Sequence, residues 1–238
     1  ITTAIMANPV SGWEGAPQSI YSDHYLNTQP IDGPIGFKLE VAPLHPVFFG
    51  ANLPGFGESQ AALFRQYPNA HVTLALMRDG FHPQSVGGKV ELRSDGSPLL
   101  DYPLTDYVLE GARRAMLAMA QIQFEAGARM VYPGHELARG TSTWTETKVA
   151  IEALPMKPLL TRIGSAHVMG GCGMAADEKA GVTRPDGQHW QLENLSIHDG
   201  SIFPTSIGAN PQLSIYGTVN RLAQGLAKRL TSKEVALA

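Results

Sequence analysis

Three short segments in the last third of the chain hold residues whose types and order could do chemistry. They are His167-Val-Met-Gly-Gly-Cys-Gly-Met174, Asn194-Leu-Ser-Ile-His-Asp-Gly-Ser-Ile-Phe-Pro204 and Gly208-Ala-Asn-Pro-Gln212. Imidazole is the side chain whose ordinary pKa lies nearest neutrality, so a histidine such as His167 can take a proton from a hydroxyl group. The chain holds eight histidines, however, and an isolated histidine more often has a structural role.

The third segment predicts the start of a helix. Asn followed by Pro is a favoured pair at an N-cap and first helical position, so Asn210 and Pro211 are expected to begin a helix that runs to about Leu230. One side of this helix is apolar: Ile215, Val219, Leu222, Leu226 and Leu230. The free N–H groups and positive dipole end of such a helix form a ready anion site, although the same pair also caps helices that bind nothing.

The elements that must position these segments begin with strands. Alternation of apolar and polar residues and the turn dipeptide Asp95-Gly96 predict four strands. They are Phe37–Val41, His71–Met77, Gly88–Arg93 and Pro98–Tyr102. We expect them to form an antiparallel sheet with one covered face.

Two further helices are predicted before the three segments. Apolar residues recur every three or four positions from Thr105, a plausible N-cap, to Gly127, a plausible residue just after the helix end. A shorter helix is expected at about Thr145 to Ala153. These helices are expected to cover one face of the sheet.

Taken together, the three segments resemble the C-terminal signature of the glucose-methanol-choline (GMC) oxidoreductase family. That signature runs from a histidine through a small Gly/Cys/Met cluster and an Asn-Leu-x-x-x-Asp-Gly-Ser segment to an Asn-Pro or a His at the start of a terminal helix. All its parts occur here in order, and the pair of strands from Gly88 to Tyr102 resembles part of the family's substrate domain. The stretch from Trp13 to Asp23 resembles members that act on long-chain alcohols, which points to an apolar substrate.

The resemblance implies an α+β chain, also described as mixed α/β, with two parts. Residues 1–155 are expected to supply a portion of a substrate-binding domain built on the antiparallel sheet. Residues 156–238 are expected to form the C-terminal portion of an FAD-binding domain.

The resemblance also implies an activity, the FAD-dependent oxidation of an alcohol by hydride transfer from the CH–OH carbon to flavin N5. His167 matches the family's catalytic histidine and is expected to be the base. Asn210 matches the second catalytic position, where the family carries Asn or His. Because an amide cannot act as a base, Asn210 is expected to donate a hydrogen bond to the substrate oxygen.

Two sets of residues are expected to touch the cofactor. Asp199 and Gly200 match the family's segment beside the ribityl and pyrophosphate groups, although Asp-Gly is also a common turn dipeptide. Asn210, Pro211 and Gln212 are expected to aim the helix N-terminus at the pyrimidine edge of the flavin, where negative charge gathers on reduction.

A complete dinucleotide-binding motif is not evident. The segment Gly171-Cys-Gly-Met-Ala-Ala176 fits G-x-G-x-x-A formally, but residues 177–185 are too short and broken for the helix that should follow. We therefore expect an N-terminal segment or a second chain to carry that motif.

The chain begins at Ile1 without an initiator Met, and its first residues do not resemble a signal peptide. We interpret this start as a cut edge.

Composition and missing motifs exclude several other classes. With 18 basic and 21 acidic residues and no run of Lys or Arg beyond a pair, the chain has no electrostatic footprint for nucleic acid. No apolar stretch approaches the ~20 residues that span a bilayer. The single Cys172 excludes an internal disulfide and a thiolate-rich metal site, and no H-E-x-x-H or G-x-S-x-G occurs. Two alternatives stay open: a hydroxynitrile lyase of the same fold, and a cofactor-free binding module.

Overall fold

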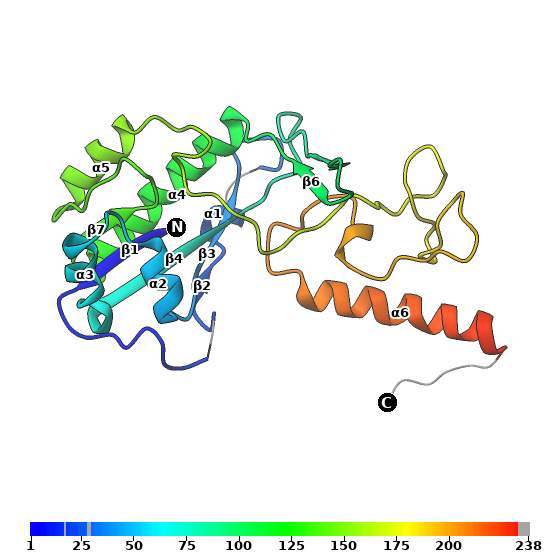
Figure 1. The fold of residues 1–238 in the computed structure, drawn as a ribbon, viewed down its shortest axis with the longest axis horizontal. Helices are drawn as coiled ribbons and strands as arrows, with labels where there is room; N and C mark the ends of the chain where they lie inside the picture. Colours follow the sequence, from blue (N-terminus) through cyan, green and yellow to red (C-terminus); the bar gives the residue numbers. More distant parts are fainter. Residues whose placement is uncertain (17, 28–29, 233–238) are drawn as a thin grey trace. The chain divides into compact units, whose positions relative to one another are not determined.

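The computed structural model describes residues 1–16, 18–27 and 30–232, which fall into two compact units (Figure 1). Unit 1 comprises Ile1–Arg78 and Leu104–Gly164, and unit 2 comprises Asp79–Pro103 and the chain from Ser165 onward. Unit 2 is therefore made of two stretches that are separated in sequence by the second half of unit 1.

Unit 1 is built on an antiparallel sheet, as the sequence predicts. Its strands lie in the order β2-β3-β4-β1-β7, and every neighbouring pair is antiparallel. Their bounds are β1 Thr2–Met6, β2 Tyr21–Ser22, β3 Phe37–Val41, β4 Ala70–Met77 and β7 Ala128–Pro133. The predicted strands at 37–41 and 71–77 are confirmed as β3 and β4.

Helices cover both faces of this sheet, so the prediction of one covered face is wrong. On one face lie α4 (Asp106–Glu125) and α5 (Trp144–Ala153), and on the other lie α2 (Pro46–Asn52) and α3 (Glu58–Phe64) (Figure 1). Successive strand residues point to opposite faces. In β1, Ala4 and Met6 pack with α4, while Ile5 packs in a second cluster with Phe49 of α2. Both faces of the central strands are apolar and both need cover.

The long helix α4 begins and ends as predicted. Thr105 is its N-cap and accepts a hydrogen bond from the Val108 N–H at 3.4 Å. Gly127 follows the C-cap with a φ of +93°, a conformation that glycine adopts without steric cost. Its side chains Ala115, Met116 and Met119 form the centre of the core on this face.

The predicted shorter helix is confirmed as α5, and a guanidinium group of α4 binds its C-terminal end. Thr143 caps its start by accepting a hydrogen bond from the Glu146 N–H at 3.2 Å. At its end, Arg113 of α4 donates to the carbonyl oxygens of Ile151 and Leu154, at 2.6 and 3.0 Å. Cationic donors suit the last carbonyls of a helix, because these have no partner within it.

Unit 2 contains a hairpin, a 3₁₀ turn and a long helix. The hairpin strands are β5 (Lys89–Leu92) and β6 (Pro98–Asp101), joined by the predicted turn in which Gly96 has a φ of +80°. We expected this hairpin to belong to the same sheet as β3 and β4. It forms a separate two-stranded sheet instead. The 3₁₀ turn η2 spans Gly200–Ile202, and the helix α6 spans Gln212–Thr231.

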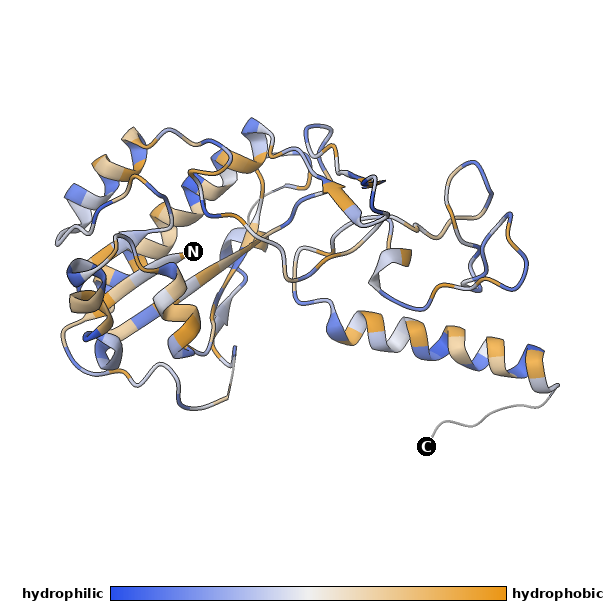
Figure 2. Cartoon of the chain, in the orientation of Figure 1, coloured by the Kyte–Doolittle hydropathy of each residue, from blue (hydrophilic) through white to orange (hydrophobic). Residues whose placement is uncertain are grey.

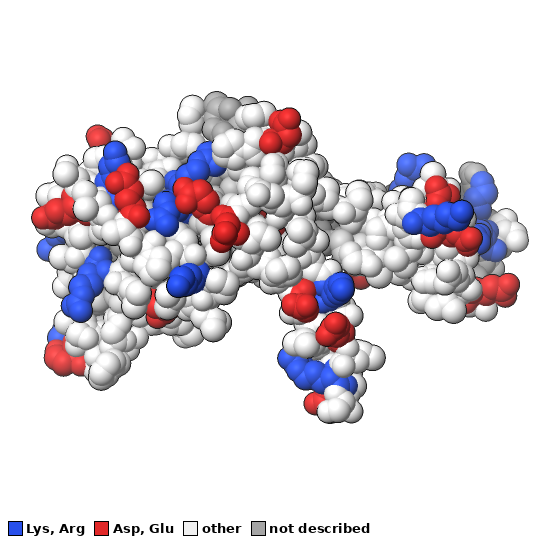
Figure 3. All heavy atoms as spheres, turned by 90° about the horizontal axis from the view of Figure 1, so that it is seen from above, with Lys and Arg blue, Asp and Glu red and all other residues white. Residues whose placement is uncertain are grey.

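The described residues show neither a membrane span nor a metal cluster. No helix within the ranges given above is long and apolar enough to cross a bilayer. The same ranges hold no group of three or more His, Cys, Asp or Glu side chains that could bind a metal ion. Acidic and basic side chains are interspersed on the face drawn in Figure 3.

Candidate active site

The first two chemical segments of the sequence run side by side in unit 2. Every second N–H from residue 170 to residue 174 donates to a carbonyl oxygen of η2. These bonds are Gly170 to Gly200 at 3.3 Å, Cys172 to Ser201 at 2.9 Å and Met174 to Ile202 at 2.8 Å. The strand-like pairing joins the segment after His167 to the Asp-Gly-Ser segment.

Gly200 joins this pair to helix α6, which follows the third segment. It is buried, and a Cβ at this position would lie 3.2 Å from the Val168 carbonyl oxygen and 3.0 Å from Ile215 Cδ1 of α6. Val168 directly follows His167, and Ile215 belongs to the first turn of α6. Both contacts would be tighter than most contacts of a Cβ atom, which favours glycine, so Gly200 has a packing role besides any role beside a cofactor.

Replacing Gly200 with alanine is expected to destabilise the protein by about 1–3 kcal/mol, since the Val168 backbone cannot move aside as a side chain could. Urea unfolding of the protein and its variant measures the change. Gly164→Ala is the matched control, because its Cβ would meet nothing within 4 Å, and it should stay within about 0.5 kcal/mol of wild type. Equal stability of the two variants would contradict the packing role.

His167 differs from the structural histidines of the chain. Within the described residues its half-buried imidazole takes part in no hydrogen bond. By contrast, His135 Nδ1 accepts from the Leu137 N–H and His189 Nδ1 accepts from the Gln191 N–H, both at 3.1 Å. The imidazole of His167 is therefore not used to hold its own loop, which suits the predicted role as a base without testing it.

The helix α6 begins one residue later than predicted. Gln212 is its first residue and Pro211, with φ −89° and ψ −5°, is the N-cap, so the prediction of Asn210 as N-cap is wrong. The reason is that the Pro211 carbonyl oxygen accepts the first helical hydrogen bond, from the Ile215 N–H at 2.9 Å. Proline offers no side-chain acceptor, so the N-cap residue itself makes no side-chain hydrogen bond to the helix.

The first turn of α6 is exposed. Gln212 and Leu213 lie at the surface, and the Gln212 side chain donates to the Tyr216 hydroxyl at 2.9 Å along the helix. Leu222 is the buried residue of α6, whereas Leu213 and Tyr216 are 83% and 61% exposed. Figure 2 shows apolar and polar bands alternating along the helix.

Asp199 forms a turn, the simpler of its two predicted interpretations. It is the N-cap of η2 and accepts from the Ser201 hydroxyl at 2.5 Å and from the Ser201 N–H at 2.8 Å. These two bonds hold the pKa of Asp199 below its usual range. The carboxylate is exposed and carries a negative charge at neutral pH, and contact with a cofactor stays a prediction.

Comparison with known families decides the identity of the chain. A model described as GMC oxidoreductase, for the C-terminal part of such proteins, matches residues 83–218. The chain belongs to the GMC oxidoreductase family. The matched span contains the hairpin and all six predicted site residues: His167, Asp199, Gly200, Asn210, Pro211 and Gln212.

Two curated relatives cover most of this GMC chain. Long-chain-alcohol oxidase FAO4A of Arabidopsis thaliana is 28% identical over 74% of the chain and 24% of its own length. The uncharacterized GMC-type oxidoreductase y4nJ of Sinorhizobium fredii is 25% identical over 93% of the chain and 41% of its own length. The chain thus spans between a quarter and two fifths of these relatives.

A solved structure shows the same fold. Pyridoxine 4-oxidase from Mesorbium loti superposes with a TM-score of 0.57 over 95% of the chain and 41% of its own length, at 17% identity. The solved structure therefore shares the mixed α/β architecture with an antiparallel sheet.

The sequence analysis rejected Gly171–Ala176 as a dinucleotide-binding motif, and the local structure of this GMC chain agrees. Residues 178–180 form a turn where a helix would be needed. The Asp177 carboxylate accepts from the N–H groups of Lys179 and Ala180, at 2.9 and 3.1 Å, and closes the turn. N–H groups of the fingerprint are committed as well, since Cys172 and Met174 donate theirs to the carbonyl oxygens of Ser201 and Ile202 at 2.9 and 2.8 Å.

Proposed function

We propose that this chain supplies the catalytic part of an FAD-dependent enzyme that oxidises the CH–OH group of an alcohol. The observation that carries the proposal is the close packing at Gly200 of the residue after His167 and the first turn of α6. Residues from the first segment, the second segment and the helix that follows the third segment meet there.

His167 is proposed to be the general base. Its imidazole takes the proton from the substrate hydroxyl, which leaves electron density on the oxygen and helps the hydride depart from the same carbon. Its lack of any hydrogen bond within the described chain supports this role, because a ring nitrogen is available to a substrate.

Asn210 is proposed to hold the substrate oxygen. Its side-chain amide is a donor at neutral pH and would stabilise the negative charge that develops on that oxygen. Asn210 lies directly before Pro211, the N-cap of α6, so it stands at the helix start that is proposed to face the flavin.

The residues of unit 2 fit FAD on chemical grounds. The exposed first turn of α6, whose N-cap Pro211 makes no side-chain hydrogen bond, offers backbone N–H groups and a positive dipole end at Gln212, which suit the pyrimidine edge of a flavin. Buried atoms His198 Nδ1 and Thr205 Oγ1, on either side of η2, have no hydrogen-bond partner within the described chain. FAD, when bound, would accept the hydride; Asp199, Gly200, Asn210, Pro211 and Gln212 are the residues proposed to hold it.

The rest of the cofactor site is proposed to come from an N-terminal segment or a second chain with a dinucleotide-binding motif.

The substrate is proposed to be an apolar alcohol, since the FAO4A relative is named for long-chain alcohols. The test is anaerobic addition of a long-chain primary alcohol to the full-length protein, which should bleach the flavin absorbance. Bound flavin that stays oxidised would favour the hydroxynitrile lyase alternative, and a flavin-free protein would favour the binding module.

The isolated 238 residues are expected to bind FAD at least about a hundredfold more weakly than the full-length protein, because the contacts to the ADP half are missing and each 1.4 kcal/mol is tenfold. Fluorescence titration with FAD measures the affinity, and circular dichroism checks that the isolated chain is folded. Equal affinity of a folded isolated chain would contradict the need for a second dinucleotide-binding part.

A further inference from the structure

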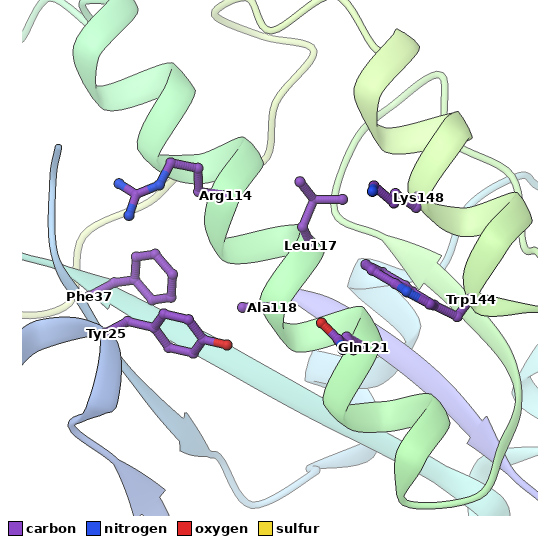
Figure 4. A pocket seen from close by; sticks show the side chains of 8 residues that line it. All are labelled: Tyr25, Phe37, Arg114, Leu117, Ala118, Gln121, Trp144 and Lys148. Atoms are coloured by element: carbon purple, nitrogen blue, oxygen red, sulfur yellow. The ribbon is translucent and has the colours of Figure 1, made fainter. Parts of the chain in front are cut away.

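Unit 1 carries an open hollow of about 260 Å³ on the surface of α4, between α1 (His24–Asn27) and α5 (Figure 4). Aromatic rings form its two sides. Tyr25 and Phe37 stack on one side, with ring centroids 4.8 Å apart, and Trp144 stands on the other. Such walls suit a flat apolar body, because aromatic rings favour stacked or edge contacts at about 4.5–7 Å.

The rim of the hollow is positively charged. The Arg114 guanidinium lies 5.8 Å from the Phe37 ring centroid, and its Nη1 donates to the Ile35 carbonyl oxygen at 2.9 Å. In the described chain no carboxylate pairs with Arg114. Lys148 on the opposite side pairs with Glu152 at 3.9 Å, but both side chains are about half exposed, so this pair is weak.

Uncommitted hydrogen-bond donors complete the lining. The Tyr25 hydroxyl, the Trp144 indole N–H and the Gln121 amide take part in no hydrogen bond within the described residues. In Figure 4 the Tyr25 hydroxyl and the Gln121 amide both lie over the α4 surface between the aromatic sides. Donors and cations around an apolar floor recognise a ligand with an anionic group and an apolar body.

We propose that this hollow binds a small aromatic carboxylate. The ring of the ligand lies between the aromatic sides, and its carboxylate accepts hydrogen bonds from Arg114 and is drawn to Lys148. A single-ring molecule is the right size, because the hollow is smaller than the roughly 300–1,000 Å³ typical of sites for drug-sized ligands. The site lies wholly within unit 1 and does not rest on the proposed oxidation.

The test is calorimetric titration of 3-phenylpropionate into the full-length holoenzyme. The neutral 3-phenylpropanamide has the same shape without the charge and should bind at least about tenfold more weakly, since a hydrogen bond to a charged group contributes about 1.5–3 kcal/mol. Arg114→Gln should lower the affinity for the carboxylate at least about tenfold for the same reason. Lys148→Gln, at a surface position, should lower it by a smaller factor.

Arg139→Gln is the matched control. Arg139 is another exposed cation of unit 1 that does not line the hollow, and its loss should leave the affinity unchanged. The proposal is overturned if the wild-type protein does not bind the carboxylate, if it binds the amide equally well, or if Arg114→Gln and Arg139→Gln behave alike. Melting temperatures show that each variant is folded before its affinity is compared.

Discussion

Replacing His167 with alanine in the full-length holoenzyme is expected to slow reduction of the flavin by the alcohol by roughly 10²–10⁴-fold, the usual effect of removing a general base. Without the imidazole, the hydroxyl proton has no acceptor as the hydride leaves. FAD should stay bound, since no other function is proposed for this side chain. Anaerobic stopped-flow absorbance measures the rate, and the flavin spectrum measures the cofactor content.

His189→Asn is the matched control for His167. His189 lies in the same unit, and its Nδ1 accepts backbone hydrogen bonds from Gln191 and Leu192 at 3.1 Å, which an asparagine oxygen can also accept. The control should reduce its flavin at the wild-type rate. If His167→Ala stayed within a few-fold of wild type, His167 would not be the base.

Asn210→Asp is expected to slow flavin reduction by roughly 10²–10³-fold, the usual effect of losing one donor to a developing oxyanion. The carboxylate removes the amide donor and adds negative charge where the substrate oxygen and the reduced flavin are negative, so the flavin reduction potential should fall too. Folding should change little, because Pro211 is the N-cap and a negative charge near a helix start is tolerated. Stopped-flow rates, redox titration and melting temperatures measure the three effects.

Two further variants at Asn210 distinguish the effect of losing the hydrogen-bond donor from the effect of adding negative charge. Asn210→Ala removes the donor without adding charge, so its rate should fall while its reduction potential changes less than that of the Asp variant. Asn210→His restores a donor of the kind that other family members carry and should recover most of the rate. An Asp variant that reduces its flavin at the wild-type rate would remove Asn210 from the active site.

Elements with strong local signals could be predicted from the sequence. Helix α4 has a capping threonine, an apolar repeat and a glycine just beyond its end, and all three lie within one stretch of chain. Strand β3 alternates polar and apolar residues and was predicted with its observed bounds, Phe37–Val41. The β5–β6 hairpin has its Asp-Gly turn.

Elements defined by distant contacts could not be predicted in the same way. All five residues of β1 are buried between β4 and β7, so Thr2–Met6 shows no alternation of exposed and buried positions. Helices α2 and α3 have seven residues each, too few to show a helical period, and Pro54 and Gly55 lie between them. Their apolar residues are recognisable as core only once the second face of the sheet is known.

In the candidate site, too, some features could be predicted from local sequence and others depend on distant contacts. His167 and the Asp199-Gly200 pair could be selected by their place in a motif, which is a local property of the sequence. The contact of Gly200 with Val168 and Ile215 depends on how three segments pack, and no spacing reveals it. The start of α6 was misplaced because Asn-Pro is a good cap pair in general, while here the proline itself accepts the first helical bond.

The division of unit 2 into two stretches of chain sets an order of events on the ribosome. The β5–β6 hairpin emerges first, but its partners from Ser165 onward are translated about 60 residues later, a wait of roughly 3–12 s at ordinary rates of synthesis. A hairpin can form within about 1–10 μs. The finished hairpin therefore waits several seconds for its partners, and during this time its strand edges must not pair with other chains. The exposed charges of Lys89, Glu91 and Asp101 on its strands oppose such pairing, as charged edge residues do in other sheets.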